Sequence, residues 1–416
     1  MNNAGLFDLL VRDLALSKIT DRPKLASEII ARAREMGVYP AAIGEIYRAL
    51  GQKTLTPMTI PAFNIRGLTF ALARVVWRKV IKLHAGPVIF ELAPSETWAG
   101  DQTYAEYAAM IFAAACREGY QGPIFLQGDH FAIESTDEVP VVLERCHEVI
   151  ASGFYQIDID GSHLIVKDPL NLSAFHTPNA KVTAQIIKHL RQQQPSGVHL
   201  VLGGEVGEIG GRDTSINDLD TYKDLLEQYL PAEIAGLDKI SAQTGTAHGG
   251  IVLQNGSTGQ MNVDFDLIAQ LSAKARDYGW SGIVQHGAST LTMRDLEKLP
   301  AAGVIEVHLA TQIQNIVFDH PAFPVDLREK MQKRLVVAAF GAEGEKIENP
   351  EALTLAQQFY KARWTAWGSF KQELWDLPAS VMTPIEDSFS DWVEDIIKSL
   401  RIDNKKEVLR QYFKGA

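Results

Sequence analysis

Eight short apolar runs, each separated from the next by an amphipathic segment, most constrain how this chain can fold. The runs are residues 58–64, 87–92, 123–129, 154–160, 198–204, 238–244, 282–287 and 304–310. Each is almost continuously apolar, which is typical of strands that are covered on both faces of a parallel sheet. The intervening segments repeat apolar residues at helical spacing, and two of them end at capping glycines, Gly119 and Gly279.

Strands that alternate with helices predict parallel βαβ units, and eight such units close into a TIM barrel. The predicted fold class is therefore α/β, with residues 56–319 forming a (β/α)₈ barrel. A doubly wound open sheet is the alternative. The G-x-G-x-x-G segment that would favour a dinucleotide-binding version of that sheet is absent after the first run.

Two regions lie outside the repeat. Residues 1–55 are predicted to form an N-terminal helical extension, with turns at residues 21–23 and 37–40. Residues 320–416 are predicted to form a C-terminal helical region that holds four of the seven tryptophans. We expect this region to pack against the barrel or against a partner subunit, because no Gly/Ser/Pro-rich linker separates it from the barrel.

Charge and cysteine usage exclude several classes of protein. The net charge is −11 and no cluster of Lys and Arg is present, which argues against nucleic-acid binding. No apolar stretch reaches the roughly 18 residues of a membrane span. Cys116 and Cys146 fall in helical patterns and are read as buried thiols, so neither disulfides nor thiolate zinc sites are expected. The N-terminus lacks the features of a signal peptide, and the expected location is cytoplasmic.

Side chains suited to metal binding and proton transfer follow the ends of the predicted strands, where TIM-barrel active sites form. In chain order they are Asp129, His130, Asp158, Asp160, His163, Glu205, His248, His286 and His308. Any one histidine would more often be structural, but five of the chain's 11 share this rim. Three imidazoles with an open coordination position are typical of a catalytic zinc site, so the sequence predicts such a site here.

Six motifs resemble those of the class II, metal-dependent ketose-bisphosphate aldolases, which cleave fructose or tagatose 1,6-bisphosphate. The motifs are PAFNI (61–65), GDH (128–130), IDGSHL (159–164), GGEVGEIGG (203–211), GTAHG (245–249) and HGAS (286–289). The last two look like the tagatose branch. Their order along the predicted strands extends the resemblance from about residue 58 to about residue 315.

This resemblance implies a zinc ion bound by His130, His248 and His286, with Glu205 as an alternate ligand or neighbour. Asp129 would exchange a proton with the C4 hydroxyl of the substrate as the C3–C4 bond breaks or forms. The zinc ion would bind the oxygens of the three-carbon unit and stabilise its enediolate. The simpler alternatives are that Asp129 only orients an imidazole and that Glu205 only caps a loop.

The resemblance also implies that backbone amides and a hydroxyl after the late strands bind the substrate phosphate. The residues at these positions are Gly249, Gly287, Ser289 and Thr311, where small side chains let the backbone approach an anion. Ser289 could equally cap the following helix. Asn64 is a further candidate for substrate binding, or no more than a hydrogen bonder at a strand end. Asp158 and Asp160 are interpreted as structural, or as neighbours of a monovalent cation near the phosphate.

Departures from the family pattern keep the reaction open. Asp213 occupies the place of a general-base glutamate, His308 replaces an asparagine, and the loop after GTAHG lacks a lysine often found near the phosphate. The first hypothesis is reversible aldol cleavage of a ketose phosphate, with Asp129, Asp213 and His308 catalytic. The second is a zinc-dependent epimerase or isomerase of a ketose or sugar acid. A third is a catalytically weakened binding or regulatory protein.

The expected partners are small. A sugar phosphate is the predicted substrate, and neither nucleic acid nor a membrane is expected to bind. An acidic chain can still hold a phosphate, because a few local cations and backbone amides are enough. The tryptophan-rich C-terminal region and the resemblance both favour a homodimer or a larger homo-oligomer.

Overall fold

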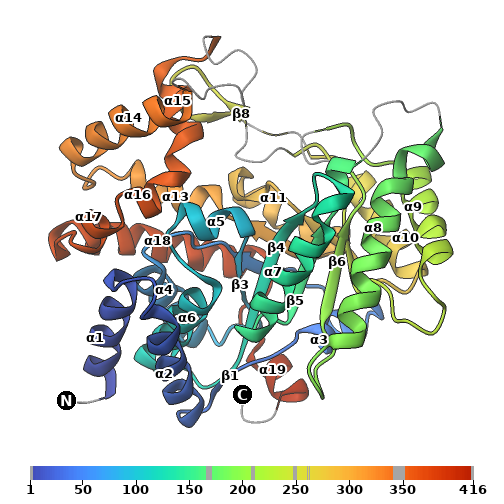
Figure 1. The fold of residues 1–416 in the computed structure, drawn as a ribbon, viewed down its shortest axis with the longest axis horizontal. Helices are drawn as coiled ribbons and strands as arrows, with labels where there is room; N and C mark the ends of the chain where they lie inside the picture. The colour runs from blue at the N-terminus through green and yellow to red at the C-terminus, as the bar shows by residue number, and fades with distance from the viewer. Residues whose placement is uncertain are drawn as a thin grey trace.

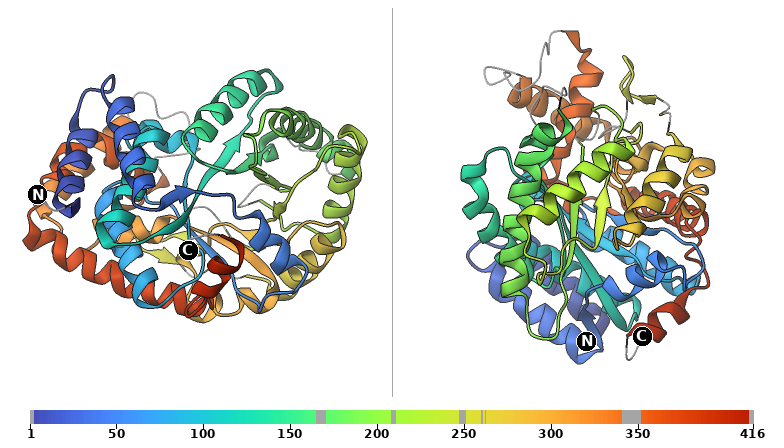
Figure 2. Two further views of the ribbon diagram at one scale, coloured as in Figure 1. Left: turned by 90° about the horizontal axis from the view of Figure 1, so that it is seen from below. Right: turned by 90° about the vertical axis from the view of Figure 1, so that its right-hand side faces the viewer.

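The computed structural model describes residues 3–164, 171–207, 211–246, 251–259, 261, 263–340 and 352–413. Eight parallel strands form a closed ring at its centre (Figures 1 and 2). They are β2 (Ile60–Phe63), β3 (Ile89–Leu92), β4 (Gly122–Ala132), β5 (Gln156–Asp160), β6 (Val201–Glu205), β7 (Lys239–Ser241), β10 (Ile283–Gln285) and β11 (Val304–Leu309). Pairing of β11 with β2 and of β4 with β5 closes the ring. The predicted TIM barrel is confirmed.

Helices connect the strands and cover the outside of the barrel with their apolar faces. They are α4 (Thr69–Lys82), α6 (Tyr104–Glu118), α7 (Val139–Ala151), α8 (Leu172–Gln193), α9 (Ile216–Tyr229), α10 (Phe265–Asp277), α11 (Met293–Leu296) and α12 (Leu299–Ala302). α6 begins where the Thr103 side chain accepts a hydrogen bond from the backbone of Glu106. It ends at Gly119, whose φ of 81° is left-handed and costs glycine little.

The N-terminal extension packs over α6 with the helices α1 (Asn3–Leu16) and α2 (Arg22–Glu35), and α3 (Gly44–Gly51) follows. The interpretation of residues 37–40 as a turn is wrong, because β1 (Val38–Pro40) is a strand there. It pairs in parallel with the start of β4, Val38 opposite Gly122. β4 is 11 residues long, and its first residues offer backbone groups that this short strand satisfies.

The chain after β11 is helical and packs on the barrel. Its helices are α13 (Thr311–Phe318), α14 (Val325–Phe340), α15 (Leu355–Ala362), α16 (Ala366–Ser369), α17 (Lys371–Trp375), α18 (Ala379–Ser399) and α19 (Lys406–Tyr412). Trp392 of α18 meets Phe63 of β2 edge-on, with 6.1 Å between ring centroids, and Trp367 stacks on Phe318 at 4.4 Å. Among the helices in the described ranges, none combines the length and the apolar character that a membrane span requires.

α14 and α15 lie beyond the carboxyl ends of the barrel strands (Figure 1). Beside α15 is a small antiparallel hairpin of β8 (Ile251–Val252) and β9 (Thr258–Gly259), which lies in the connection between β7 and α10. Gln357 of α15 donates a hydrogen bond to the backbone oxygen of Val252 at 2.9 Å. The C-terminal region therefore extends to the carboxyl end of the barrel, where the residues that follow the strands lie close together.

A buried ion cluster joins the N-terminal extension, the barrel and the C-terminal region. Glu106 of α6 lies 3.1 Å from Nη1 of Arg22 on α2, and 2.7 Å from Nζ of Lys371 on α17. Asp101 lies 2.8 Å from Nη2 of Arg22. Burial raises the pKa of Glu106, although Lys371 and Arg22 act in the opposite direction. One cluster of paired charges thus connects the three regions of the chain.

Candidate active site

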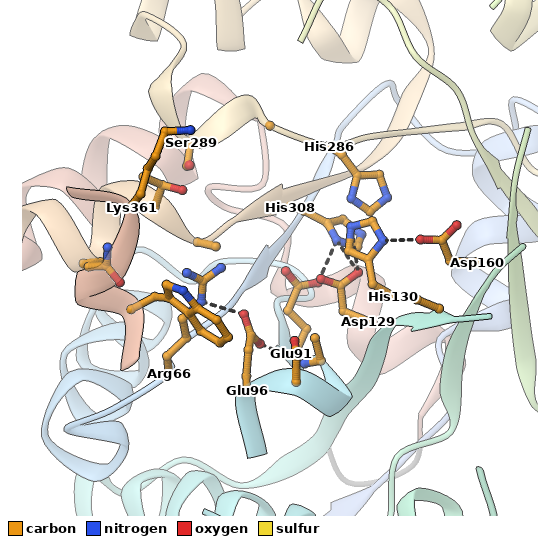
Figure 3. A pocket seen from close by; sticks show the side chains of 18 of the residues that line it. Arg66, Glu91, Glu96, Asp129, His130, Asp160, His286, Ser289, His308 and Lys361 are labelled. Carbon is orange, nitrogen blue, oxygen red and sulfur yellow. Dashed lines mark hydrogen bonds and ion pairs between the residues drawn. The ribbon is translucent and has the colours of Figure 1, made fainter. Parts of the chain in front are cut away.

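A pocket of about 470 Å³ opens at the carboxyl end of the barrel. Its walls come from the ends of β3, β4, β5, β10 and β11, and from α5 (Pro94–Ala99), α13 and the end of α15 (Figure 3). This end of a (β/α)₈ barrel is where TIM-barrel enzymes carry their active sites. The predicted site residues that line it are Asp129, His130, His286, Gly287, Ser289, His308 and Thr311.

An irregularity near the end of β4 directs Asp129 and His130 into the pocket. The register of β4 against β5 shifts between Gly128 and Phe131, which places one extra residue in β4. His130 has a φ of 44°, in the left-handed region that residues other than glycine rarely adopt. A Cβ at Gly128 would lie 2.5 Å from the Phe131 ring, so a side chain there would force that ring to move. Bulges and strained backbone of this kind are frequent at active sites.

His130 lies among carboxylates from neighbouring strands. Its Nδ1 is 3.1 Å from Oδ2 of Asp160 and 3.3 Å from Oε2 of Glu205, and its ring centroid is 4.4 Å from that of His286. Burial opposes charge on the imidazole, but Asp129 and Glu205 outweigh it and hold the pKa of His130 well above its usual value. Burial, together with the charge of Asp160, raises the pKa of Glu205 to about 7.

His286 follows β10, and a side chain of the neighbouring strand β7 orients its imidazole ring. Ser241, the last residue of β7, places its Oγ 2.9 Å from Nε2 of His286. A hydrogen bond at one ring nitrogen leaves the other as the nitrogen that can bind a metal. Gly287 has a φ of 66° and turns the chain into the short 3₁₀ helix Ala288–Thr290, which brings Ser289 to the pocket.

The donor atoms around these histidines fit a divalent metal ion. Atoms of Asp129, His130 and His286 all lie within 4.8 Å of one another, and so do atoms of His130, Asp160 and Glu205. Oδ1 of Asp129 is buried, and Nδ1 of His308 lies 3.1 Å from it as an ion-pair partner. Imidazole and carboxylate donors without thiolates suit zinc and other first-row divalent ions. These residues can therefore hold a metal.

His308 on β11 contacts carboxylates through both ring nitrogens, and Figure 3 shows it beside Asp129. Its Nδ1 is 3.0 Å from Oε2 of Glu91 and 3.1 Å from Oδ1 of Asp129, and its Nε2 is 2.6 Å from Oε1 of Glu306. Burial disfavours charge on the ring, but Glu91 and Asp129 outweigh it and raise the pKa of His308 well above its usual value. Despite its own burial, the pKa of Asp129 is held well below the usual range by His130 and His308.

A further layer of charged groups inside the barrel fixes Glu306. Nζ of Lys239 is 2.7 Å from Oε1 of Glu306, 2.9 Å from Oδ1 of Asp158 and 2.8 Å from Oε1 of Gln127. Burial would raise the pKa of Glu306, but Lys239 and His308 lower it to about 2. Burial raises the pKa of Asp158 to about 6. Asp158 thus pairs with a buried lysine, as the structural interpretation of this residue requires.

The wall opposite the histidines carries positive charge. Arg66, which follows β2, places its Nε 2.6 Å from Oε1 of Glu96. Lys361 at the end of α15 lines the same side as Ser289 (Figure 3). The pocket therefore has imidazoles and carboxylates on one side, and on the other side two cations together with the Glu96 carboxylate that pairs with Arg66.

Two predicted site residues lie behind the pocket lining. Asn64 is buried and donates from Nδ2 to Oε2 of Glu96 at 2.9 Å, so it supports the partner of Arg66. Glu205 is buried behind His130, at the distance given above. Asn64 thus acts on the pocket through Glu96, and Glu205 lies where an alternate metal ligand would be.

Asp213 is exposed and is not among the residues that line the pocket. The guanidinium of its neighbour Arg212 pairs with Asp218 of α9 at 2.5 Å, which fastens this segment to the outside of the barrel. The general-base role of Asp213 remains a prediction. His248 and Gly249 lie outside the described residues.

Several residues of the pocket and of the charged layer behind it were not identified from the sequence. Glu91 and Glu306 interrupt apolar strand runs, and Lys239 begins one, so a charge inside a strand was a usable signal. Arg66 lies just beyond the PAFNI motif without a distinguishing pattern. Lys361 lies far beyond the last strand, and only the packing of α15 brings it to the pocket.

A closed (β/α)₈ barrel with imidazoles and carboxylates gathered at the carboxyl ends of its strands is the arrangement typical of metal-dependent barrel enzymes. The family model described as Fructose-bisphosphate aldolase class-II matches residues 50–405. The chain belongs to this family, and the assignment made from the six motifs is confirmed.

Several solved structures are similar to this chain at low sequence identity. Fructuronate-tagaturonate epimerase UxaE from Cohnella laeviribosi is 11% identical with a TM-score of 0.57, covering 84% of this chain and 83% of that chain. Fructose-bisphosphate aldolase (Fba) from Campylobacter jejuni is 17% identical with a TM-score of 0.47, covering 89% and 97%. The YdjI aldolase from Escherichia coli K12 is 15% identical with a TM-score of 0.46, covering 81% and 97%. At 11% identity, the similarity to the epimerase concerns the fold alone.

Proposed function

We propose that this chain is a metal-dependent aldolase that reversibly cleaves a ketose phosphate into a three-carbon ketose phosphate and an aldehyde. One observation carries the proposal. Asp129 lies beside His130 and His286 at the carboxyl end of the barrel, with Ser289 and Lys361 on the other side of the same pocket. Membership of the class II family supports the same reaction.

His130, His286 and, by the resemblance, His248 would hold the metal, with Glu205 near enough to His130 to serve as an alternate ligand. We infer zinc, because the donors are imidazoles and carboxylates and the chain has no nearby thiolate. When bound, zinc would supply Lewis-acid chemistry, polarising the ketone oxygen of the substrate and stabilising negative charge there.

Asp129 is the proton-transfer group in this proposal. Its lowered pKa keeps it a carboxylate at neutral pH, and it faces the pocket. It takes the proton of the C4 hydroxyl, C4 becomes the aldehyde carbon, and the electron pair of the C3–C4 bond passes to the three-carbon fragment. A proton delivered to C3 completes the ketose phosphate. His308 contacts the Asp129 carboxylate and keeps it oriented.

The phosphate would lie at the late strands. Gly287 has a left-handed conformation and lets an anion approach the backbone closely. Ser289, in the short 3₁₀ helix that follows, offers its hydroxyl. Thr311 adds a side chain at the start of α13. A pocket of about 470 Å³ lies in the range of small-molecule sites and has room for an open-chain sugar phosphate.

A second candidate is epimerisation of a ketose or sugar acid, and the placement of His308 favours it. A charged imidazole beside a carboxylate offers an acid and a base in one pocket. The pair would remove the proton from the carbon next to the ketone, and return of a proton to the opposite face of that carbon would complete the inversion. No carbon–carbon bond would break.

A coupled assay for triose phosphate separates the two reactions. Fructose and tagatose 1,6-bisphosphate are supplied to the metal-loaded protein, and release of the three-carbon product supports the aldolase. Appearance of the stereoisomer without triose phosphate moves the function to the epimerase. His308→Asn is the diagnostic variant, because the family has asparagine there. It should retain cleavage at a reduced rate in an aldolase, because Asp129 loses a contact, and should abolish stereochemical inversion in an epimerase.

A further inference from the structure

A buried glutamine links the end of β10 to the residues that follow β7. Gln285, the last residue of β10, is fully buried and directly precedes His286. Its Nε2 donates hydrogen bonds to the backbone oxygen of His286 at 2.9 Å and to Oγ1 of Thr246 at 3.1 Å. Its Oε1 accepts a hydrogen bond from Oγ1 of Thr244 at 2.8 Å. One carboxamide therefore holds both segments at fixed positions relative to each other.

Thr246 is held from a second side by another buried amide. Nε2 of Gln243, two residues after β7, donates to the backbone oxygen of Thr246 at 2.7 Å. Gly245 has a φ of 88°, and this left-handed turn lets both Thr244 and Thr246 reach the same carboxamide. In the sequence, Thr246 lies two residues before His248. These bonds therefore fix the point from which the segment with His248 begins.

Gln243, Thr244, Thr246 and Gln285 form what we call the glutamine network, and it extends to the connection between β6 and α9. The backbone N–H of Gln243 donates to Oγ1 of Thr214 at 3.0 Å. Its backbone oxygen accepts a hydrogen bond from the N–H of Thr214 at 2.8 Å. All five side chains are buried. The connections that follow three barrel strands are thus joined by one set of hydrogen bonds beside His286.

The packing of the strands alone does not account for an amide at the end of β10. The residues before it, Ile283 and Val284, are apolar and buried, and an aliphatic side chain at the next position would also cover the barrel. A buried carboxamide costs free energy unless its donors and acceptor are bonded. Both donors of Gln285 and its oxygen have partners, and every partner belongs to a segment next to a histidine.

We propose that Gln285 and Gln243 are positioning residues of the metal site. They hold the segment that carries His248 at a fixed place relative to His286, so that the two imidazoles are arranged before the metal binds. Such preorganisation lowers the entropic cost of binding. The inference rests on the proposed function for the assignment of these histidines as ligands. It does not depend on whether the reaction is aldol cleavage or epimerisation.

The zinc Kd tests the proposal, and competition between the holoenzyme and a chromophoric chelator measures it. Gln285→Leu should raise this Kd about tenfold or more, the usual effect of losing a residue that orients a metal ligand. Thr246→Val removes one hydroxyl at nearly constant volume and should also raise it, whereas Thr246→Ser should bind zinc like the parent protein. The double variant Gln285→Leu/Thr246→Val should match Gln285→Leu, because both changes remove the same hydrogen bond.

Gln156→Leu is the matched control. Gln156, the first residue of β5, is also fully buried, and its carboxamide bonds to the backbone of Leu126 and Ile43 at the amino end of the barrel. This variant should lower the free energy of unfolding, as Gln285→Leu does, but leave the zinc Kd unchanged. An equal loss of zinc affinity in both variants would overturn the proposal, because affinity would then follow general stability.

His286→Ala separates failure of this inference from failure of the proposed function. Zinc lost in His286→Ala but bound with the parent Kd in Gln285→Leu and Thr246→Val would overturn the positioning role and keep the metal site. Parent-like binding in all three variants would overturn the ligand assignment and the positioning role together. A raised zinc Kd in Gln285→Leu, with no sugar cleaved by the zinc-loaded parent, would keep the positioning role and overturn the aldolase. Because Thr246→Val removes a single hydroxyl, it tests the network even if Gln285→Leu fails to fold.

Discussion

At the residue scale, the neighbours of Asp129 determine both its orientation and its charge. A bulge in β4 turns it into the pocket, and His130 and His308 keep it charged although it is buried. A carboxylate of this kind can accept a proton only from a group whose own acidity has been increased, as for a hydroxyl next to a metal-polarised centre. The geometry therefore links proton transfer at Asp129 to the metal site beside it.

Asp129→Asn should keep the metal and lose turnover. The amide has the same shape but cannot accept the proton, so we expect kcat to fall by about 10²-fold or more. Metal content measured on the same sample should equal that of the parent protein. Near-normal turnover would mean that Asp129 only orients His130 or His308.

His286→Ala should remove bound metal together with activity, because the imidazole is one of the few donors that converge at this point. His199→Gln is a suitable control, since His199 is exposed and precedes β6 at the amino end of the barrel. Metal analysis after gel filtration distinguishes the two variants. Undiminished metal in His286→Ala would refute the ligand assignment.

At the scale of elements, the ion cluster around Glu106 joins helices from three regions of the chain. Glu106→Gln should lower the free energy of unfolding by about 3 kcal/mol or more, because Arg22 and Lys371 lose a buried partner. Urea denaturation measures the change. Glu407→Gln alters an exposed carboxylate on α19 and should cost less than about 0.5 kcal/mol. Equal effects of the two variants would contradict a shared buried cluster.

The start of α9 supplies a pH-dependent contribution to stability. Burial alone would raise the pKa of Asp218, but Arg212, His176 and Ser215 together hold it well below the usual range. A depressed folded-state pKa gives stabilisation that is present above about pH 4, the ordinary carboxyl value, and is lost as the pH falls further. Asp218→Asn should therefore destabilise the protein more at pH 7 than at pH 3. A difference independent of pH would rule this contribution out.

At the scale of the whole molecule, the barrel could be predicted because each strand is covered on both faces and reads as an apolar run. The strand β1 could not be predicted, because three residues that end in a proline are too few to show a strand-like sequence pattern. The strand forms only through its pairing with the start of β4 at Gly122. The histidines could be predicted because barrel strands end at one rim. Lys361 could not, because its place at the pocket depends on how α15 packs against the hairpin after β7 and against α13.

The central claim is that cleavage of a phosphorylated ketose depends on a metal held at the carboxyl end of this barrel. The most direct measurement is triose-phosphate release from fructose and tagatose 1,6-bisphosphate before chelation, after chelation and after zinc is restored. We predict release from at least one sugar, loss of release in the metal-free protein and recovery with zinc. Cleavage that persists after all metal has been removed, or no cleavage by the zinc-loaded protein, would contradict the account.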